Sequence, residues 1–194
     1  MNNSMIVKHT YLLALTMLLS IALYAHEQVK VDLDNDGKPD NVSLIQNGDN
    51  EYSIQYTLSE SGKKHATQNI SGGDENKLSV KNNILIVSSQ FMRGENYFKF
   101  RYDKRRKEII LIGYDNIQYG NATNSGSGNE SYNLLTGDYE AKWNWFDEKT
   151  GKLISLPTIR KKLPIHIFTL EDFSNRTIDT LYDLGYKYLP KQLK

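Results

Sequence analysis

Apolar and polar residues alternate with a period of two through much of the first half of this chain. The segments 41–46 and 52–58 alternate in this way, and a polar stretch, Asn-Gly-Asp-Asn-Glu, that is typical of a hairpin turn separates them. A second pair of segments, 97–102 and 109–114, flanks the polar stretch Asp-Lys-Arg-Arg-Lys-Glu. A period of two places successive side chains on opposite faces of a strand. The pattern therefore predicts antiparallel hairpins that bury one face.

The second half of the chain predicts further strands around a polar loop. Residues 115–130 contain few apolar side chains and include Asn-Ala-Thr-Asn-Ser-Gly-Ser-Gly-Asn-Glu, so we expect a flexible loop there. Residues 131–146 are expected to form one or two strands with a turn at 136–138. Residues 152–156 then predict a return strand, which extends the series of hairpins.

The tail of the chain predicts one or two short helices. Apolar residues recur near helical spacing in 169–185, with Thr169 as a candidate cap, Asp172 three residues later and Gly185 as the expected stop. The expected fold is therefore mainly β, an antiparallel sheet or sandwich of hairpins with an N-terminal calcium loop and a short C-terminal helical tail. We expect residues 26–194 to form a single β-rich domain.

The first 25 residues have the pattern of a signal peptide. Lys8 and His9 precede an apolar run over 11–24, and Ala25 is a plausible last residue before cleavage. The run is short for a membrane span, so we expect no stable span after cleavage and a periplasmic or secreted product. The chain contains no cysteine, so disulfides cannot stabilise it.

Four aspartates crowd around one glycine directly after the expected signal peptide. Asp32, Asp34, Asp36 and Asp40 follow the spacing D-x-D-x-D-G-x-x-D. Calcium binds six to eight hard oxygen ligands, and alternating aspartates can surround it while the glycine makes the sharp turn. Without a cation these carboxylates would repel one another. The spacing therefore predicts a Ca²⁺ site in the loop 32–43, with the Lys38 carbonyl as the backbone ligand.

The calcium loop does not match an EF-hand. Its twelfth position is Ser43 rather than the bidentate glutamate, and no amphipathic helix precedes it. The motif also occurs once, which argues against a propeller with one loop in each blade. A structural clamp is therefore the favoured role, and an ordinary polar turn without a metal is the alternative.

Composition argues against two broad classes of function. The chain carries a net charge of only +1, so it has no general attraction to nucleic acid. The basic clusters 104–107 and 160–162 are more typical of solvated surface than of a contact with an acidic partner. His65 and His166 are the histidines well inside the expected domain, and no nucleophile motif or metalloprotease motif occurs. We therefore predict no enzymatic activity.

Two features remain as candidates for binding a partner. Trp143 and Trp145 are two residues apart and would share one face of a strand, either to close the core or to form a stacking platform for sugar rings. The segment 123–132 is small and polar and is anchored by a tyrosine. A loop of this kind can enter a narrow enzyme cleft, although a simple flexible connection is the alternative.

The chain resembles a group of small exported bacterial proteins that combine one such calcium loop with a β-rich domain similar to periplasmic lysozyme inhibitors. Three segments carry the resemblance: 32–40, 100–115 and 131–137. The group includes immunity proteins against peptidoglycan-cleaving toxins, in which a Ser-Gly loop enters the lysozyme cleft. The resemblance implies that Ser127, Gly128 and Tyr132 shape that loop.

The sequence thus predicts an exported calcium-binding protein that inhibits a lysozyme-like peptidoglycan hydrolase by loop insertion. The alternative is a binding module for cell-wall or surface glycan, which would use Trp143 and Trp145. Retention on purified peptidoglycan distinguishes the two, because a glycan module is retained and an inhibitor is not.

Overall fold

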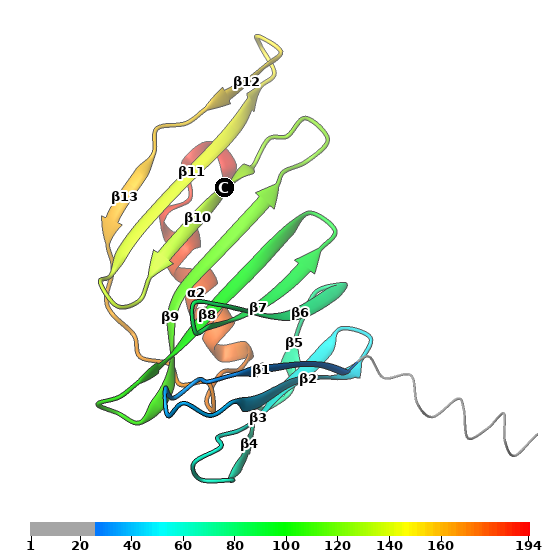
Figure 1. The fold of residues 1–194 in the computed structure, drawn as a ribbon. Coiled ribbons are helices and arrows are strands. Elements are labelled where there is room, and N and C mark those ends of the chain that lie inside the picture. The colour runs from blue at the N-terminus through cyan, green and yellow to red at the C-terminus, as the bar shows by residue number, and fades with distance from the viewer. Residues whose placement is uncertain (1–25) are drawn as a thin grey trace, which may run out of the picture.

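The computed structural model describes residues 26–194, and the expected signal peptide at 1–25 lies outside them. The described chain forms two antiparallel sheets and one long helix near its C-terminus (Figure 1). This confirms the prediction of a mainly β fold with a helical tail. No helix in residues 26–194 is long and apolar enough to cross a bilayer.

The smaller sheet is formed by the N-terminal part of the described chain. Its strands are β1 (His26–Val31), β2 (Asp40–Gly48), β3 (Glu51–Thr57), β4 (Lys64–Ala66) and β5 (Ile70–Ser71). The order is β1-β2-β3-β4, and β5 also pairs with β3. The β2–β3 hairpin is the one that the alternation over 41–58 predicts. Its inward residues Val42, Leu44 and Ile54 are fully or almost fully buried.

The larger sheet has eight strands. They are β6 (Glu75–Lys81), β7 (Ile84–Phe91), β8 (Gly94–Asp103), β9 (Glu108–Tyr119), β10 (Ser127–Asn133), β11 (Asp138–Asp147), β12 (Lys152–Ser155) and β13 (Ile159–Lys162). The order is β12-β11-β10-β9-β8-β7-β6, and β13 also pairs with β11. Neighbours along this path are neighbours in sequence, so the path is built from consecutive hairpins.

The expected long loop over 115–130 is wrong, because most of it is strand. β9 continues to Tyr119 and β10 begins at Ser127, which leaves only 120–126 between them. Asn116 lies opposite Glu130 in the register of this pair, and both side chains are buried. The strand is polar because these buried side chains bond one another, which a search for apolar alternation does not detect.

The helix α2 (Asn175–Tyr188) begins later than predicted, and a short 3₁₀ helix η1 (Lys191–Leu193) follows it. The predicted Thr169 interaction forms: the Thr169 hydroxyl accepts a hydrogen bond from the Asp172 N–H at 3.1 Å. It closes a turn rather than the helix, whose N-cap is Ser174. Gly185, the expected stop, lies inside the helix.

One face of the larger sheet is covered by α2 and the segment before it (Figure 1). Phe173 is completely buried, and its ring lies 4.9 Å from that of Phe98 and 5.1 Å from that of Phe100. Leu170 and Leu181 are buried in the same core. The helix therefore packs on β8 to β11, and it buries the polar residues of β9 and β10 together with the apolar ones.

Candidate functional site

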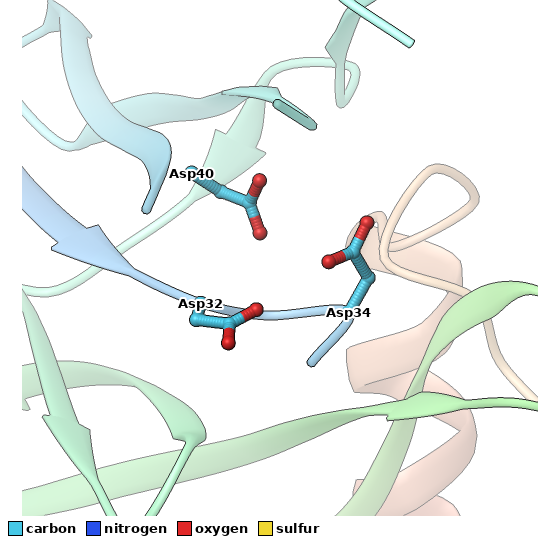
Figure 2. Close-up of side chains that lie close together, drawn as sticks. All are labelled: Asp32, Asp34 and Asp40. Carbon is cyan, nitrogen blue, oxygen red and sulfur yellow. The ribbon is translucent and has the colours of Figure 1, made fainter. Parts of the chain in front are cut away.

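Three of the predicted metal ligands lie together at the junction of β1 and β2. Asp32 and Asp34 follow β1, and Asp40 is the first residue of β2. One carboxylate oxygen from each residue lies within 4.8 Å of the others. Figure 2 shows the three carboxylates turned toward a common space. Hard oxygen donors at this separation are the ligand type that Ca²⁺ prefers, so the triad can hold a metal ion.

The loop 32–40 is shaped by its own hydrogen bonds. The backbone N–H groups of Asp36 and Gly37 both donate to the Asp32 carboxylate at 3.0 Å. Gly37 has a φ of +86° and Asn35 a φ of +60°, which are left-handed conformations that glycine and asparagine tolerate best. The predicted turn at Gly37 is therefore confirmed, and it brings Asp32 and Asp40 together.

Burial makes the negative charges of the triad unfavourable in the absence of a cation. Asp40 is fully buried, and its two oxygens accept hydrogen bonds from the backbone N–H groups of Leu33 at 2.8 Å and Ser59 at 2.7 Å. Asp34 is 7 % exposed, and its Oδ2 has no hydrogen-bond partner among residues 26–194. Burial raises the pKa of Asp34, and the negative charge of Asp40 adds to the effect. A cation between these groups would relieve both costs.

Two predicted ligands are placed differently from the triad. Asp36 is exposed and is not part of it. The Asp36 carboxylate accepts hydrogen bonds from the Lys38 N–H at 2.7 Å and from the Ser59 hydroxyl at 3.0 Å. Lys38 is exposed as well, and the role of its backbone carbonyl as a ligand stays a prediction.

A residue in a turn of the larger sheet holds the metal loop in place by hydrogen bonds. Asn83, in the turn between β6 and β7, donates from its side-chain amide to the Asp32 carbonyl and to Asn35 Oδ1, both at 2.9 Å. Asn83 is distant from this loop in sequence, so the sequence reasoning missed it. The only feature of the sequence that pointed to Asn83 was the predicted turn at Lys-Asn-Asn.

The three residues predicted to shape an inserting loop lie within β10. The Ser127 hydroxyl accepts a hydrogen bond from Asn144 Nδ2 at 3.1 Å. A Cβ on Gly128 would approach the Lys142 carbonyl oxygen to 2.0 Å, so the strands pack too closely there for a side chain. Tyr132 is 2 % exposed, and its hydroxyl donates to the Pro164 carbonyl. The prediction of a loop over 123–132 is therefore wrong from Ser127 onward.

The segment that does connect β9 and β10 is the loop 120–126. Residues 121–124 are exposed at its tip. Asn121 Oδ1 accepts hydrogen bonds from the N–H groups of Thr123 and Ser125, both at 3.0 Å. Arg93, in the neighbouring β7–β8 turn, donates to the Gly120 carbonyl at 2.7 Å. The loop is thus small, polar and ordered by hydrogen bonds.

The tryptophan pair does not form an exposed platform. Trp143 is 6 % exposed and belongs to the core, whereas Trp145 is half-buried on the same strand. Trp143 therefore fits the interpretation of a residue that closes the core, whereas Trp145 is not part of that core.

The second basic cluster is largely neutralised by its neighbours. Arg160 pairs with Glu140 at 2.8 Å and Lys162 pairs with Asp138 at 2.6 Å, across the β11–β13 pairing. Both pairs are exposed, which favours the solvated-surface interpretation of this cluster.

Sequence reasoning also missed a buried acid. Glu130 is 4 % exposed and lies beneath the helix α2 at Gly185. An acid at an inward position of β10, in step with the buried Tyr132, is the signal that could have identified it.

The chain matches no family model, no curated protein sequence and no solved structure. Function is therefore inferred from the geometry of the metal triad and of the loop 120–126.

Proposed function

We propose that this protein is an exported calcium-binding inhibitor of a lysozyme-like peptidoglycan hydrolase. In this proposal the loop 120–126 enters the cleft of the hydrolase, and the Asp32, Asp34 and Asp40 triad holds Ca²⁺ as a structural clamp. The observation that carries the proposal is the combination of exposure and internal order in that loop.

The loop 120–126 is ordered by bonds on both sides as well as within itself. The Gly126 N–H donates to the Asn144 carbonyl at 2.8 Å, and the Phe146 N–H donates to the Ser125 hydroxyl at 3.1 Å. A loop that is already held in one conformation loses little conformational entropy when it binds. This supports a binding role over a merely flexible connection.

The tip of the loop has suitable chemistry for a cleft lined by catalytic acids. Asn121, Thr123 and Asn124 offer amide and hydroxyl donors, and residues 120–126 contain no acidic side chain. Glu130, the nearest acid along β10, is buried beneath α2, so it does not confront the acids of a target. Donors without a negative charge favour contact with carboxylates.

The metal triad lies away from this loop. Burial raises the pKa of Tyr102 and the charge of Asp34 adds to it, which places the triad near the end of β8 where Tyr102 pairs with Ile109. The loop 120–126 follows the other end of β9. This separation supports a stabilising role for the ion rather than direct contact with the hydrolase.

The test is a bulky substitution at the tip, Thr123→Trp, with Lys149→Trp as the matched control. Lys149 is exposed in the β11–β12 turn, at the same end of the sheet. Clearing of a peptidoglycan suspension is measured with a panel of lysozymes and peptidoglycan-hydrolase toxins. We expect the parent chain and Lys149→Trp to inhibit at least one of them, and Thr123→Trp to lose about tenfold or more in inhibitory potency.

Two outcomes would contradict the proposal. Equal inhibition by Thr123→Trp would exclude the loop as the inserting element. Retention of the protein on purified peptidoglycan, without inhibition of any hydrolase, would favour a glycan-binding module instead.

A further inference from the structure

A cleft separates the C-terminal part of the chain from the larger sheet, close to the end of β9 and the start of β10. Its volume is about 670 Å³. The sheet contributes Asn116, Gln118, Glu130 and Trp143 to its lining. The helix α2 and the residues after it line the opposite side, with Tyr182, Asp183, Gly185, Tyr186, Leu189 and Lys194 among them. Polar groups of the sheet thus face aromatic groups of the helix.

Glu130 is a buried carboxylate in this cleft, and the lysine that also lines the cleft, Lys194, has its Nζ over the Tyr186 ring, 5.3 Å from the ring centre. Its Oε1 accepts a hydrogen bond from Asn116 Nδ2 at 2.9 Å, and its Oε2 accepts one from the Tyr139 hydroxyl at 2.6 Å. Both donors are neutral. No lysine, arginine or histidine within residues 26–194 forms an ion pair with Glu130. Buried carboxylates are normally paired with a positive charge. Glu130 lacks such a partner, so a bound cation would stabilise its ionised form.

Trp143 provides a second, independent observation. The residue is 6 % exposed, and it lines the same cleft. The indole Nε1–H has no acceptor among the described residues. An unpaired buried donor costs free energy that a ligand oxygen would recover. The lining of the cleft therefore includes one residue with a buried donor that lacks an acceptor and one carboxylate that lacks an ion pair.

Gly185 provides the space above the carboxylate. A Cβ at this helix position would lie 2.4 Å from Glu130 Oε2, closer than any real contact. The absence of a side chain lets the helix pass directly over the acid while the acid keeps its two hydrogen bonds. The tyrosines Tyr182 and Tyr186 stand on the helix on either side of this glycine and line the same cleft.

We propose that this cleft binds a small protonated primary amine that carries a neighbouring hydroxyl oxygen, such as an amino sugar or amino alcohol. The ammonium group pairs with Glu130, and the oxygen accepts the hydrogen bond of Trp143 Nε1–H. The Tyr186 ring has the Lys194 ammonium over it, 5.3 Å from its centre, so an amine that binds beside this ring displaces the lysine side chain. Asp183 at the rim adds negative charge there.

Two other ligand classes suit the cleft less well. A divalent cation requires several charged oxygens, and Glu130 faces amide and hydroxyl donors rather than further carboxylates. A neutral sugar could stack on the exposed Tyr186 ring, but it would leave Glu130 without a positive partner. The uncompensated charge of Glu130 is the feature that selects an amine.

The test uses three probes with the same ring: glucosamine, N-acetylglucosamine and glucose. Only glucosamine carries an amino group that is protonated at about pH 6. The chain is labelled with ¹⁵N, and the two indole N–H resonances are followed during each titration. Trp143→Phe and Trp145→Phe assign the resonances. We expect glucosamine to shift the Trp143 resonance in a saturable way, with Trp145 as the internal reference, and the other two sugars to leave it in place.

Glu130→Gln keeps the size of the side chain but removes its charge, and it should weaken glucosamine binding about tenfold or more. Glu148→Gln, at an exposed turn position, is the matched control and should bind as the parent does. A folded Glu130→Gln chain with unchanged binding would overturn the proposal. So would an equal shift with all three sugars, or no shift of the Trp143 resonance with glucosamine. If Glu130→Gln fails to fold, the sugar comparison on the parent chain still decides the outcome.

Discussion

At the scale of single residues, Asp40 and Glu130 are both buried carboxylates, but their surroundings differ. Asp40 lies beside Asp32 and Asp34, so several negative charges share one space. Glu130 is held by two neutral donors from Asn116 and Tyr139. A cluster of carboxylates favours a divalent ion, whereas a single carboxylate is balanced by one positive charge. The same chemical group thus supports two different binding proposals.

Tyr56 carries a pH prediction. Burial raises its pKa to about 12, and the charges of Glu171, Glu108 and Asp172 add to the effect. Its ring stacks on that of His65, with centroids 4.7 Å apart. The neutral phenol is the favoured form in the fold. Its contribution to stability is therefore complete below pH ~10, the unfolded pKa, and is lost as the pH rises through 12.

We expect Tyr56→Phe to raise the pH at which the protein unfolds in alkali, because phenylalanine has no proton to lose. Far-UV circular dichroism during an alkaline titration measures this midpoint. Tyr186→Phe is the control, since Tyr186 is 60 % exposed. A midpoint that is the same in Tyr56→Phe and in the parent would refute this account of Tyr56.

At the scale of elements, the β9–β10 pair and the helix α2 determine where polar groups are buried. β9 places Asn116 opposite Glu130 in β10, and Gln118 Nε2 donates to Asn116 Oδ1 at 2.7 Å. The helix covers this polar cluster at Gly185. The helix position is therefore set by a close contact with a side chain as well as by apolar packing around Leu181.

Gly185→Ala is expected to destabilise the protein, although alanine ordinarily favours a helix. The added Cβ would displace the Glu130 carboxylate from its hydrogen bonds with Asn116 and Tyr139, at a cost of about 1–3 kcal/mol in the free energy of unfolding. Urea denaturation measures the change. Asp179→Ala, on the exposed side of the same helix, should change stability by less than about 0.5 kcal/mol. Stabilisation by Gly185→Ala would show that the contact is not tight.

At the scale of the whole molecule, specific contacts and a shared core join the two sheets and the helix. The Leu78 N–H of β6 donates to Glu27 Oε2 of β1 at 2.7 Å, and the Ser71 N–H of β5 donates to Asn175 Oδ1 of α2. One core of buried side chains includes residues of both sheets and of the helix. A ligand that stabilises the metal loop should therefore stabilise the larger sheet as well.

The fluorescence of Trp143 and Trp145 tests this coupling, because both residues lie in β11 of the larger sheet. Calcium at a hundredfold excess over its Kd stabilises a folded protein by about 2.7 kcal/mol, which corresponds to about 5–10 °C in the unfolding midpoint of a chain of this size. We expect this shift in the tryptophan signal, and we expect chelation to reverse it.

Asp34→Asn should abolish the calcium shift, because it removes one charge of the triad. Asp49→Asn, in the exposed β2–β3 turn, is the control and should keep the shift. A tryptophan transition that calcium leaves unmoved in the parent chain would contradict the coupling or the metal site.

Short-range pattern in the sequence was enough to predict several elements of this fold. Alternation over 41–58 and 97–114 predicts hairpins that the structure confirms, because strand pairing across a short turn is a local event. The aspartate spacing likewise predicts that Asp32, Asp34 and Asp40 converge, since Gly37 turns the chain between them.

The remaining features of the fold depend on packing between segments that are far apart in the sequence. The polar strand ends of β9 and β10 are buried by the helix α2, which begins more than forty residues later in the chain, so their composition alone suggested a loop. The same long-range packing places Tyr132 in the core, Gly185 over Glu130, and Asn83 beside the metal loop. Sequence determined which residues could turn, pair and carry charge. Contacts between distant segments determined which of those charges are buried and which loop is exposed, because burial depends on what packs against a residue and not on its neighbours in the chain.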